Sequence, residues 1–307
     1  MLVMINRFQH QGIHWVDLES PTPDEVDEIA QEFELGNLLP QDLLGPSLRA
    51  RADAYPRFTY AVLHFPATRH TGGENRTQEV DFVIGEKFII TSHYDIVPAV
   101  YDFTRSFEAD VLLKHASNPK YKSGHVLLEL TERLYQSVEN ELESLEDSIS
   151  AVEREIFEGH EKEMVVALSV VSRELLNQKR TLSAHKDVLD SLEQITVMTL
   201  GEEYGNFLRG MKSFHARVYT KALALGDVIG ELRETNSALL YTRQNEIMKT
   251  FTIMAFTTFP LTLIAAIFSM DVQPPLPGTQ YDFWFILGGM ALMTTAFFTY
   301  FKIKRWL

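Results

Sequence analysis

The chain has 307 residues, no cysteine and a formal net charge of -14 at pH 7. Without cysteine, disulfide bonds and thiolate metal sites are excluded, and the negative charge argues against a nucleic-acid partner because the phosphate backbone would repel it. The same charge suits an attraction for cations but is also common in ordinary water-facing domains. The first ten residues lack a basic stretch followed by an apolar core, so we expect no signal peptide.

Residues 1–118 carry the alternating pattern of an α/β domain. Trp15-Val16-Asp17-Leu18 predicts a short strand. Thr22 is suited to cap a helix that begins at Pro23, because Glu25 stands three residues past the cap, as in a capping box. The other predicted elements are strands at Phe58–Phe65, Val80–Ile84 and Phe88–Thr91, of which the last two form a hairpin, and a loop at Thr71–Asn75.

Residues 119–249 lose the strand pattern and predict a region of three long helices. The second helix covers about Glu161–Met198, Gly201 and Gly205 mark a break, and the third begins near Phe207. The first helix has a glutamate-rich side with two possible interpretations, a solvated face or a loose attraction for cations. Its apolar side recurs in steps of three and four at Leu127, Leu130, Leu134, Val138, Leu142, Leu145, Ile149, Val152 and Ile156.

Residues 250–307 form a third part with two uncharged stretches, Thr250–Met270 and Phe283–Phe301. A helix needs roughly 20 apolar residues to cross the ~30 Å hydrocarbon core of a bilayer, so both stretches predict membrane spans. The alternative is a pair of buried core helices in a soluble protein. It is disfavoured because neither stretch has a polar face.

Basic residues flank the two spans but are absent from the loop between them, residues 271–282. They are Arg243, Lys249, Lys302, Lys304 and Arg305. The positive-inside rule then places both termini and the large N-terminal part in the cytoplasm, in a multi-pass protein of the plasma (inner) membrane. Trp284 and Trp306 suit the aromatic belts at the two membrane interfaces.

No strong helix breaker separates the third long helix from the first span. One helix from about Phe207 to Met270 would be roughly 95 Å long at about 1.5 Å per residue. An isolated helix of that length has no reason to be stable, so it must pack against the other long helices or against copies of itself. We therefore expect an oligomer.

No catalytic signature is present. The sequence contains no His-Glu-x-x-His motif, no phosphate-binding loop and no Gly-x-Ser-x-Gly motif, and His160-Glu161 lacks a second histidine four positions on. The ten histidines are dispersed along the chain. We expect neither an enzyme nor a bound cofactor.

One face of the first span is the candidate ion pathway. Pro260 lies within this span and removes a helix hydrogen bond, which is tolerated when other helices lie alongside. Several copies of the face around an axis would line a narrow, mostly apolar channel, and apolar constrictions can gate by dewetting. The alternative is an ordinary helix–helix interface. The face contains Asn245, Met248, Phe251 or Thr252, Ala255, Phe259, Thr262 and Ala266.

The outer end of the first span carries Phe268-Ser269-Met270-Asp271. One carboxylate per subunit at a pore mouth would form a ring of negative charge, and such rings favour cations. Asp271 is therefore a candidate contact for a hydrated metal ion. The simpler interpretation is that Asp271 is only the first residue of the loop in water.

The chain resembles the CorA family of divalent-cation transporters over nearly its whole length, and most specifically near the C-terminus. In the N-terminal part, the resemblance includes Trp15-Val16-Asp17-Leu18 and the hairpin that ends in Thr91-Ser92-His93. The specific segments are Asn245-Glu246-Ile247-Met248-Lys249, Phe259-Pro260-Leu261-Thr262, Ala266-Ile267-Phe268-Ser269-Met270-Asp271 and Tyr300-Phe301-Lys302-Ile303-Lys304-Arg305-Trp306.

This resemblance implies a homopentamer with a funnel-shaped cytoplasmic domain. The first spans would line the pore, and the second spans would surround them in the bilayer. The implied substrate is Mg²⁺, often with Co²⁺ or Ni²⁺, moved passively and regulated by cytoplasmic divalent ions bound between subunits. The family's Gly-Met-Asn signature is altered here, because Ser269 replaces the glycine and Asp271 replaces the asparagine, while Met270 matches.

The altered signature makes the ion less certain than the fold. Mg²⁺ sheds its waters reluctantly, and five carboxylates would hold it more strongly than five amides while repelling one another. One alternative is a Zn²⁺ or other transition-ion transporter of the same fold, in which Asp271 supplies a titratable group. Another is a non-conducting membrane scaffold or sensor.

Overall fold

The computed structural model describes residues 4–36, 39–66, 77–112, 121–269, 281–304 and 306. Its contacts divide the chain into two compact units, Met1–Arg233 and Glu234–Leu307. One helix, α6 (Tyr204–Phe268), contributes to both units. The three-part division at residues 118 and 249 stays a prediction.

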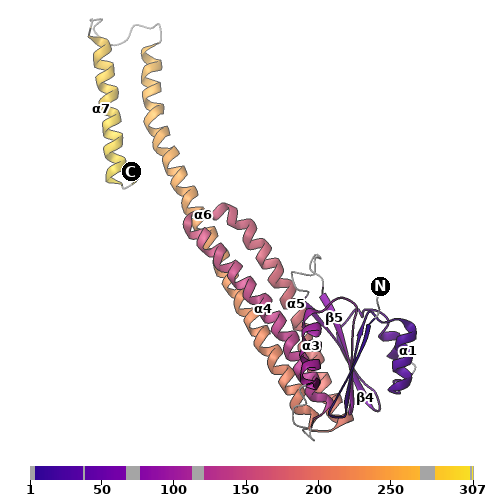
Figure 1. The fold of residues 1–307 in the computed structure, drawn as a ribbon. Coiled ribbons are helices and arrows are strands. Elements are labelled where there is room, and N and C mark those ends of the chain that lie inside the picture. The colour runs from indigo at the N-terminus through magenta and orange to yellow at the C-terminus, as the bar shows by residue number, and fades with distance from the viewer. Residues whose placement is uncertain are drawn as a thin grey trace. The chain divides into compact units, whose positions relative to one another are not determined.

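The first unit is built on a six-stranded sheet (Figure 1). The strand order is β1-β2-β6-β5-β4-β3; among the strands that the structure describes, only β2 and β6 pair in parallel. The strands are β1 (Met4–His10), β2 (Ile13–Glu19), β3 (Arg51–Ala54), β4 (Phe58–Pro66), β5 (Thr77–Gly85) and β6 (Phe88–His93).

One face of the sheet is covered by α1 (Pro23–Glu32) and α2 (Leu39–Asp42). The carboxylate of Glu25 accepts hydrogen bonds from the backbone N–H and the hydroxyl of Thr22, both at 2.8 Å, so the predicted capping box is confirmed. The core on this face contains Val16, Leu18, Val26, Ile29, Leu35, Leu39, Leu43, Phe58, Tyr60, Val62, Val83 and Ile90.

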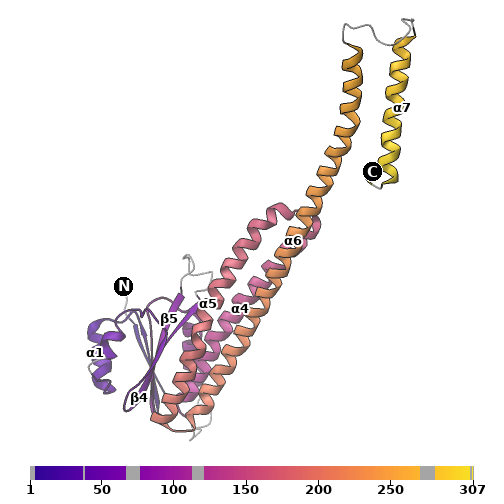
Figure 2. The ribbon, with the colours of Figure 1, turned by 180° about the vertical axis from the view of Figure 1, so that it is seen from behind.

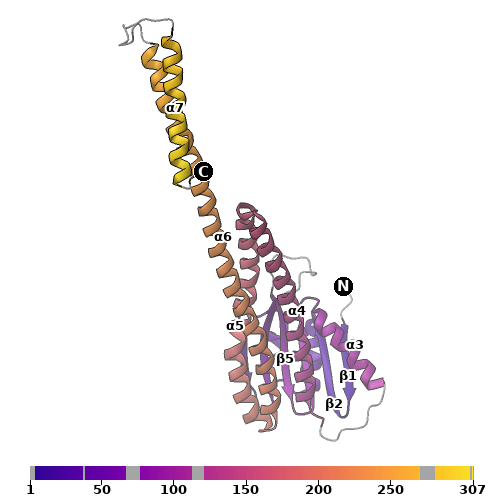
Figure 3. The same cartoon turned by 90° about the vertical axis from the view of Figure 1, so that its left-hand side faces the viewer.

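Long helices cover the other face. They are α3 (Pro98–Leu112), α4 (Ser123–Glu158) and α5 (Glu161–Leu200). Figures 2 and 3 show α4, α5 and the first part of α6 side by side. All nine apolar positions predicted for the inner side of the first long helix are buried in α4, which confirms the periodicity.

The predicted strands and long helices are confirmed, with small shifts at their ends. Four elements escaped prediction: β1, β3, α2 and α3. Strands β1 and β3 are the two edges of the sheet, and α2 has only 4 residues. Edge strands and single turns carry weak periodic patterns because they are half solvated or too short. The loop predicted at Thr71–Asn75 lies outside the described residues.

The second unit contains the end of α6 and α7 (Asp282–Ile303). Both helices include stretches long and apolar enough to cross a membrane. The helix α6 has 65 residues and continues through Pro260, which confirms the predicted continuity from the third long helix into the first span. Because Pro260 has no N–H, the carbonyl of Phe256 loses its helical partner at this point.

Candidate ion pathway and its surroundings

The predicted pore-lining residues share one side of α6. Phe251 and Phe259 are 62% and 73% exposed within the chain, and Asn245, Met248, Thr262 and Ala266 are also exposed. Thr252 and Ala255 are half-buried. This side of the helix is therefore largely uncovered by the chain's own residues, and it is available to face further helices or water.

The half-buried residues farther along the span lie on the other side of α6. At about 100° per residue, Thr257, Leu261 and Ile264 point away from Phe259, Thr262 and Ala266. In α7, half-buried or buried residues recur at Ile286, Met290, Met293, Thr294, Phe297 and Phe301. Each helix thus has a more covered face, and beyond Ala255 the covered face of α6 is not the predicted stripe.

The threonines of the α6 span satisfy their hydroxyl groups within the helix. Thr252, Thr257, Thr258 and Thr262 each donate to the carbonyl four residues earlier, at 2.7–2.9 Å. A hydroxyl that donates in this way keeps lone pairs that can accept. On the exposed stripe, Thr262 can therefore accept a hydrogen bond from water, including water held by a metal ion.

The predicted mouth of the pathway is only partly described. The backbone N–H of Ser269 donates to the carbonyls of Ala265 and Ala266 at 3.0 and 3.2 Å, and Ser269 is exposed just past the end of α6. Met270 and Asp271 lie outside the described residues. The placement of the altered signature thus rests on sequence.

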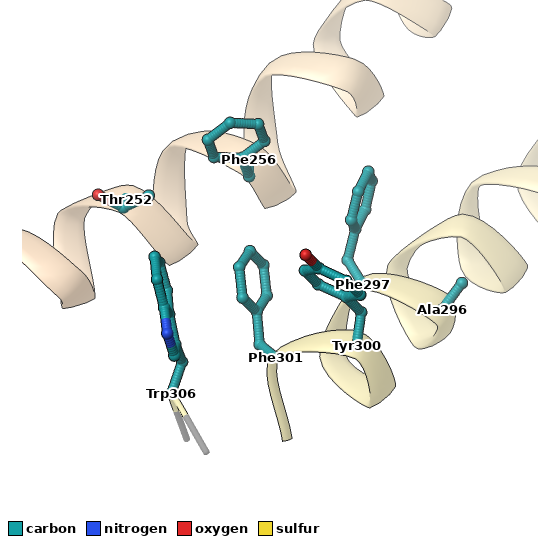
Figure 4. Close-up of a pocket in the computed structure, with 7 residues that line it drawn as sticks. All are labelled: Thr252, Phe256, Ala296, Phe297, Tyr300, Phe301 and Trp306. Atoms are coloured by element: carbon teal, nitrogen blue, oxygen red, sulfur yellow. The ribbon is translucent and has the colours of Figure 1, made fainter. Parts of the chain in front are cut away.

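A cavity of about 480 Å³ lies between α6 and the C-terminal end of α7 (Figure 4). Sequence reasoning missed it, because its walls come from two segments about fifty residues apart. The only signal was Trp306, interpreted as part of an aromatic belt. The cavity is lined by Thr252, Phe256, Ala296, Phe297, Tyr300, Phe301 and Trp306.

In the first unit, three glutamates on the glutamate-rich side of α4 pair with cations of α6. Arg217 lies 3.0 Å from the carboxylate of Glu139, and Lys221 lies 3.5 and 3.2 Å from those of Glu143 and Glu146. These exposed pairs contribute little stability individually. They do neutralise part of the acidic face of α4, for which the sequence allowed two interpretations, a solvated face or a surface that attracts cations.

The first unit also buries two carboxyl groups on β5, Glu79 and Asp81. The hydroxyl of Tyr60 donates to Oδ2 of Asp81 at 2.9 Å, and His64 Nε2 lies 3.0 Å from Oε2 of Glu79. Burial and the neighbouring Glu79 raise the pKa of Asp81 well above its usual range. The hydrogen bond to Glu79 raises the pKa of His64. Sequence reasoning missed this buried pair. The signal in the sequence was two acidic residues at alternate positions of an otherwise apolar strand.

One cluster of possible metal ligands occurs among the described residues. Carboxylate and imidazole atoms of Glu155, Glu158 and His160 lie within 4.8 Å of one another at the turn between α4 and α5. All three side chains are exposed, and His160 Nδ1 already pairs with Glu155 at 2.9 Å. Exposed acidic groups of this kind are common without an ion, so we assign no metal site here.

The fold and the helix pair define a membrane protein with a large water-facing α/β unit. The family described as CorA-like Mg²⁺ transporter protein matches residues 10–305. This chain therefore belongs to the CorA family, whose members are transporters and not enzymes.

Individual relatives agree with this assignment. The cobalt/magnesium transport protein CorA of Thermotoga maritima is 22% identical over 96% of this chain and 82% of its own length. The complete structure of the CorA magnesium transporter from Methanocaldococcus jannaschii matches with a TM-score of 0.82 at 18% identity, covering 98% of this chain and 93% of that one. The full-length CmaX structure matches with a TM-score of 0.70 at 18% identity, covering 96% and 88%. These two likenesses concern the fold.

Proposed function

We propose that this chain assembles as a homopentamer that conducts Mg²⁺, and related ions such as Co²⁺ and Ni²⁺, through a pore lined by α6. The observation that carries the proposal is the largely exposed stripe of α6, from Asn245 through Phe259 to Ala266, whose outer part lies away from the half-buried residues Thr257, Leu261 and Ile264. Five copies of this stripe around an axis would enclose a pore, and α7 would lie outside it.

The chemistry of the stripe suits an ion that keeps its water. Thr262 offers an acceptor to the hydration shell, and Phe259 supplies an apolar constriction that can gate by dewetting. Mg²⁺ dehydrates reluctantly, so contacts through water are expected to guide it along the helix. At the mouth, a ring of Asp271 carboxylates would concentrate cations before entry.

The family and the basic residues after α7 support the orientation. Lys302 and Lys304 follow the second span, so the positive-inside rule places both termini and the first unit in the cytoplasm of a plasma membrane protein. The membrane potential, negative inside, would then drive the cation inward. In this arrangement, cytoplasmic divalent ions between subunits of the acidic first unit would regulate opening.

The direct test is Mg²⁺ influx into proteoliposomes that contain the purified chain and a Mg²⁺-sensitive dye, under an inside-negative potential. We expect influx well above that of empty liposomes. A well-folded pentamer without influx would contradict conduction and favour a non-conducting scaffold or sensor.

A second candidate function is transport of Zn²⁺ or another transition ion. Asp271 favours it, because a carboxylate is titratable and binds such ions more strongly than the amide of the family signature. Competition in the same flux assay separates the two. If Zn²⁺ enters in preference and excess Mg²⁺ does not compete, the second candidate replaces the first.

A further inference from the structure

A polar cluster lies inside the first unit, on the face of the sheet that α1 and α2 cover. Tyr60, Val83 and Ile90 belong to the core on this face. Because side chains alternate between the two faces of a sheet, residues an even number of positions away on the same strands share that face. The cluster contains Tyr60 and His64 of β4, Glu79 and Asp81 of β5, and Ser92 of β6.

Two buried oxygen atoms of this cluster, Oδ1 of Asp81 and Oγ of Ser92, have no hydrogen-bond partner within the part of the chain that the structure describes. Both residues are 0% exposed, and the strand register places them directly opposite each other on β5 and β6. The Cβ atoms of such a pair lie about 4.5–5.5 Å apart on one face of the sheet. Because nearly all buried polar groups have partners, these two neighbouring oxygens point to a ligand between them.

The other oxygens of the two carboxyl groups already have partners. Oδ2 of Asp81 accepts from the hydroxyls of Tyr60 and Tyr94, at 2.9 and 3.4 Å.

Glu79 is fully engaged as well. Both of its oxygens accept from the backbone N–H of Ser47 at 2.8 Å. His64 Nε2 lies 3.0 Å from Oε2 of Glu79 and 3.0 Å from the carbonyl oxygen of Ser47. Both neighbours of this nitrogen are acceptors, so Nε2 carries a proton and donates. The open position of the cluster is therefore at Asp81 and not at Glu79.

The guanidinium group beside the cluster is also paired. Arg51 lies 2.8 Å from the carboxylate of Asp42 and 2.9 Å from that of Asp53, and it covers the ring of Tyr60 at 5.5 Å from the centroid. Its charge is thus shared between two carboxylates other than Asp81. A buried carboxylate is costly unless a positive charge and hydrogen bonds compensate it, and Asp81 has the hydrogen bonds only.

We propose that Oδ1 of Asp81 and Oγ of Ser92 bind a monovalent alkali cation, Na⁺ or K⁺, inside the first unit. The two donors are oxygens, which hard cations prefer, and one open carboxylate oxygen calls for one positive charge. Mg²⁺ is a poor occupant, because full burial would strip its waters and it dehydrates reluctantly. The site lies within one chain, so it depends neither on a pentamer nor on the transported ion.

Thermal unfolding of the full chain in detergent tests the site, followed by the fluorescence of Trp15, which is buried in the first unit. The chain is unfolded at pH 8 in sodium, potassium or choline chloride, each at about 150 mM, so that general screening is equal. Choline is too large to fit between two adjacent strands. In choline chloride only a proton competes for Asp81, because burial raises the pKa of this carboxyl to about 8.

We expect the unfolding temperature to be several degrees higher in sodium or potassium chloride than in choline chloride, because an ion that binds only the folded chain stabilises it. Ser92→Ala and Asp81→Asn should each abolish this difference. The measured quantity is the difference between salts within one variant, so a general loss of stability does not obscure it. Ser169→Ala and Asp102→Asn, both at exposed positions, are the matched controls and should keep the native difference.

Three results would overturn the proposal. Equal unfolding temperatures of the native chain in all three salts would mean that water or a proton occupies the site. A native-sized difference that persists in either Ser92→Ala or Asp81→Asn would place the ion elsewhere. Stabilisation by magnesium chloride that depends on Asp81, without any effect of alkali ions, would indicate a divalent site. Ser92→Ala removes a single oxygen atom, so it decides the question if Asp81→Asn does not fold.

Discussion

The hydroxyl of Tyr135 lies 2.8 Å from Nδ1 of His185 and joins α4 to α5 in the core of the first unit. The other ring nitrogen, Nε2, lies 2.7 Å from the carbonyl oxygen of His64, which can only accept. Nε2 of His185 therefore carries a proton, and in the neutral ring Nδ1 accepts from the hydroxyl of Tyr135. Burial lowers the pKa of His185 to about 3.

This neutral histidine makes the first unit sensitive to acid. The unfolded chain binds a proton at His185 near the ordinary histidine pKa of about 6.5, whereas the folded chain does not until about pH 3. Stability contributed by the neutral ring is present above the unfolded pKa and lost as pH falls toward the folded pKa. Between pH 7 and 5, the loss from this group is roughly 2 kcal/mol.

Replacing His185 by glutamine should remove this component. The free energy of unfolding can be measured by denaturant unfolding of the full chain in detergent, followed by Trp15 fluorescence. Between pH 7 and 5, it should fall by roughly 2 kcal/mol less in His185→Gln than in the native chain. His14→Gln, at an exposed histidine, should leave the native pH dependence unchanged. An identical pH slope for native chain and His185→Gln would contradict the neutral assignment.

The buried carboxyl of Asp81 has the opposite pH dependence. Its pKa is raised by burial and by Glu79, so the protonated form is favoured in the fold and stability falls as pH rises above the unfolded pKa. Asp81→Asn should therefore stabilise the chain at pH 8 by on the order of 1 kcal/mol, because it removes an ionisable buried group. The stabilisation of Asp81→Asn relative to the native chain should decrease toward pH 4.

The same unfolding assay tests Asp81. Asp102→Asn, at an exposed position on α3, is the control and should change stability little at any pH. If Asp81→Asn is destabilised at pH 8, the folded chain favours the ionised carboxylate of Asp81 and not its protonated form, which would contradict this prediction.

Gly124 sets the contact between the start of α4 and the start of α6. A Cβ at this position would meet a ring carbon of Phe207 at a distance that real Cβ atoms do not show. Gly124→Ala should cost roughly 1–3 kcal/mol of unfolding free energy, because the packed ring must shift. The matched control is Gly230→Ala on exposed α6, where a Cβ meets nothing within 4 Å.

Gly230→Ala should stabilise α6 by about 0.5–1 kcal/mol, because alanine restricts the unfolded chain and favours a helix. Thermal unfolding of both variants decides the matter. Equal melting temperatures for Gly124→Ala and the native chain would mean that the Phe207 ring can shift at little cost and that the start of α4 is not tightly packed against the start of α6.

Phe259 tests the apolar constriction. On the proposed pore stripe, Phe259→Ala should raise Mg²⁺ influx several-fold at resting internal Mg²⁺, because a smaller side chain lowers the dewetting barrier. Met254→Ala shortens an exposed side chain on another side of α6 and should leave influx near the native level. Equal effects of the two variants would indicate that the stripe is only a helix–helix interface.

The parts of the fold that the sequence predicted have strong local periodicity. The nine apolar positions of α4 repeat in steps of three and four, and the unbroken run from Phe207 predicted the length of α6 to within a few residues. Contacts between distant segments left no such pattern. Tyr135 meets His185 only because α4 and α5 pack together, and Phe301 meets Trp306 only because the chain turns after α7.

The candidate pathway also has a part that the sequence predicted and a part that it could not predict. Its stripe follows from helical spacing, and the structure places those residues on a largely exposed side of α6. The cavity beside it combines residues about fifty positions apart, so no spacing rule could find it. The ion that enters depends on Asp271, whose effect on selectivity is a matter of charge and hydration and not of helix geometry.

The most direct measurement is Mg²⁺ influx into proteoliposomes that contain a Mg²⁺-sensitive dye, under an inside-negative potential, for the native chain and for Asp271→Asn. We predict influx in both, with a several-fold weaker apparent affinity for Mg²⁺ in the variant, because the variant loses the ring of charge at the mouth. No influx through a well-folded native pentamer, together with influx through Asp271→Asn, would contradict the account and show that the carboxylate ring closes this protein to Mg²⁺.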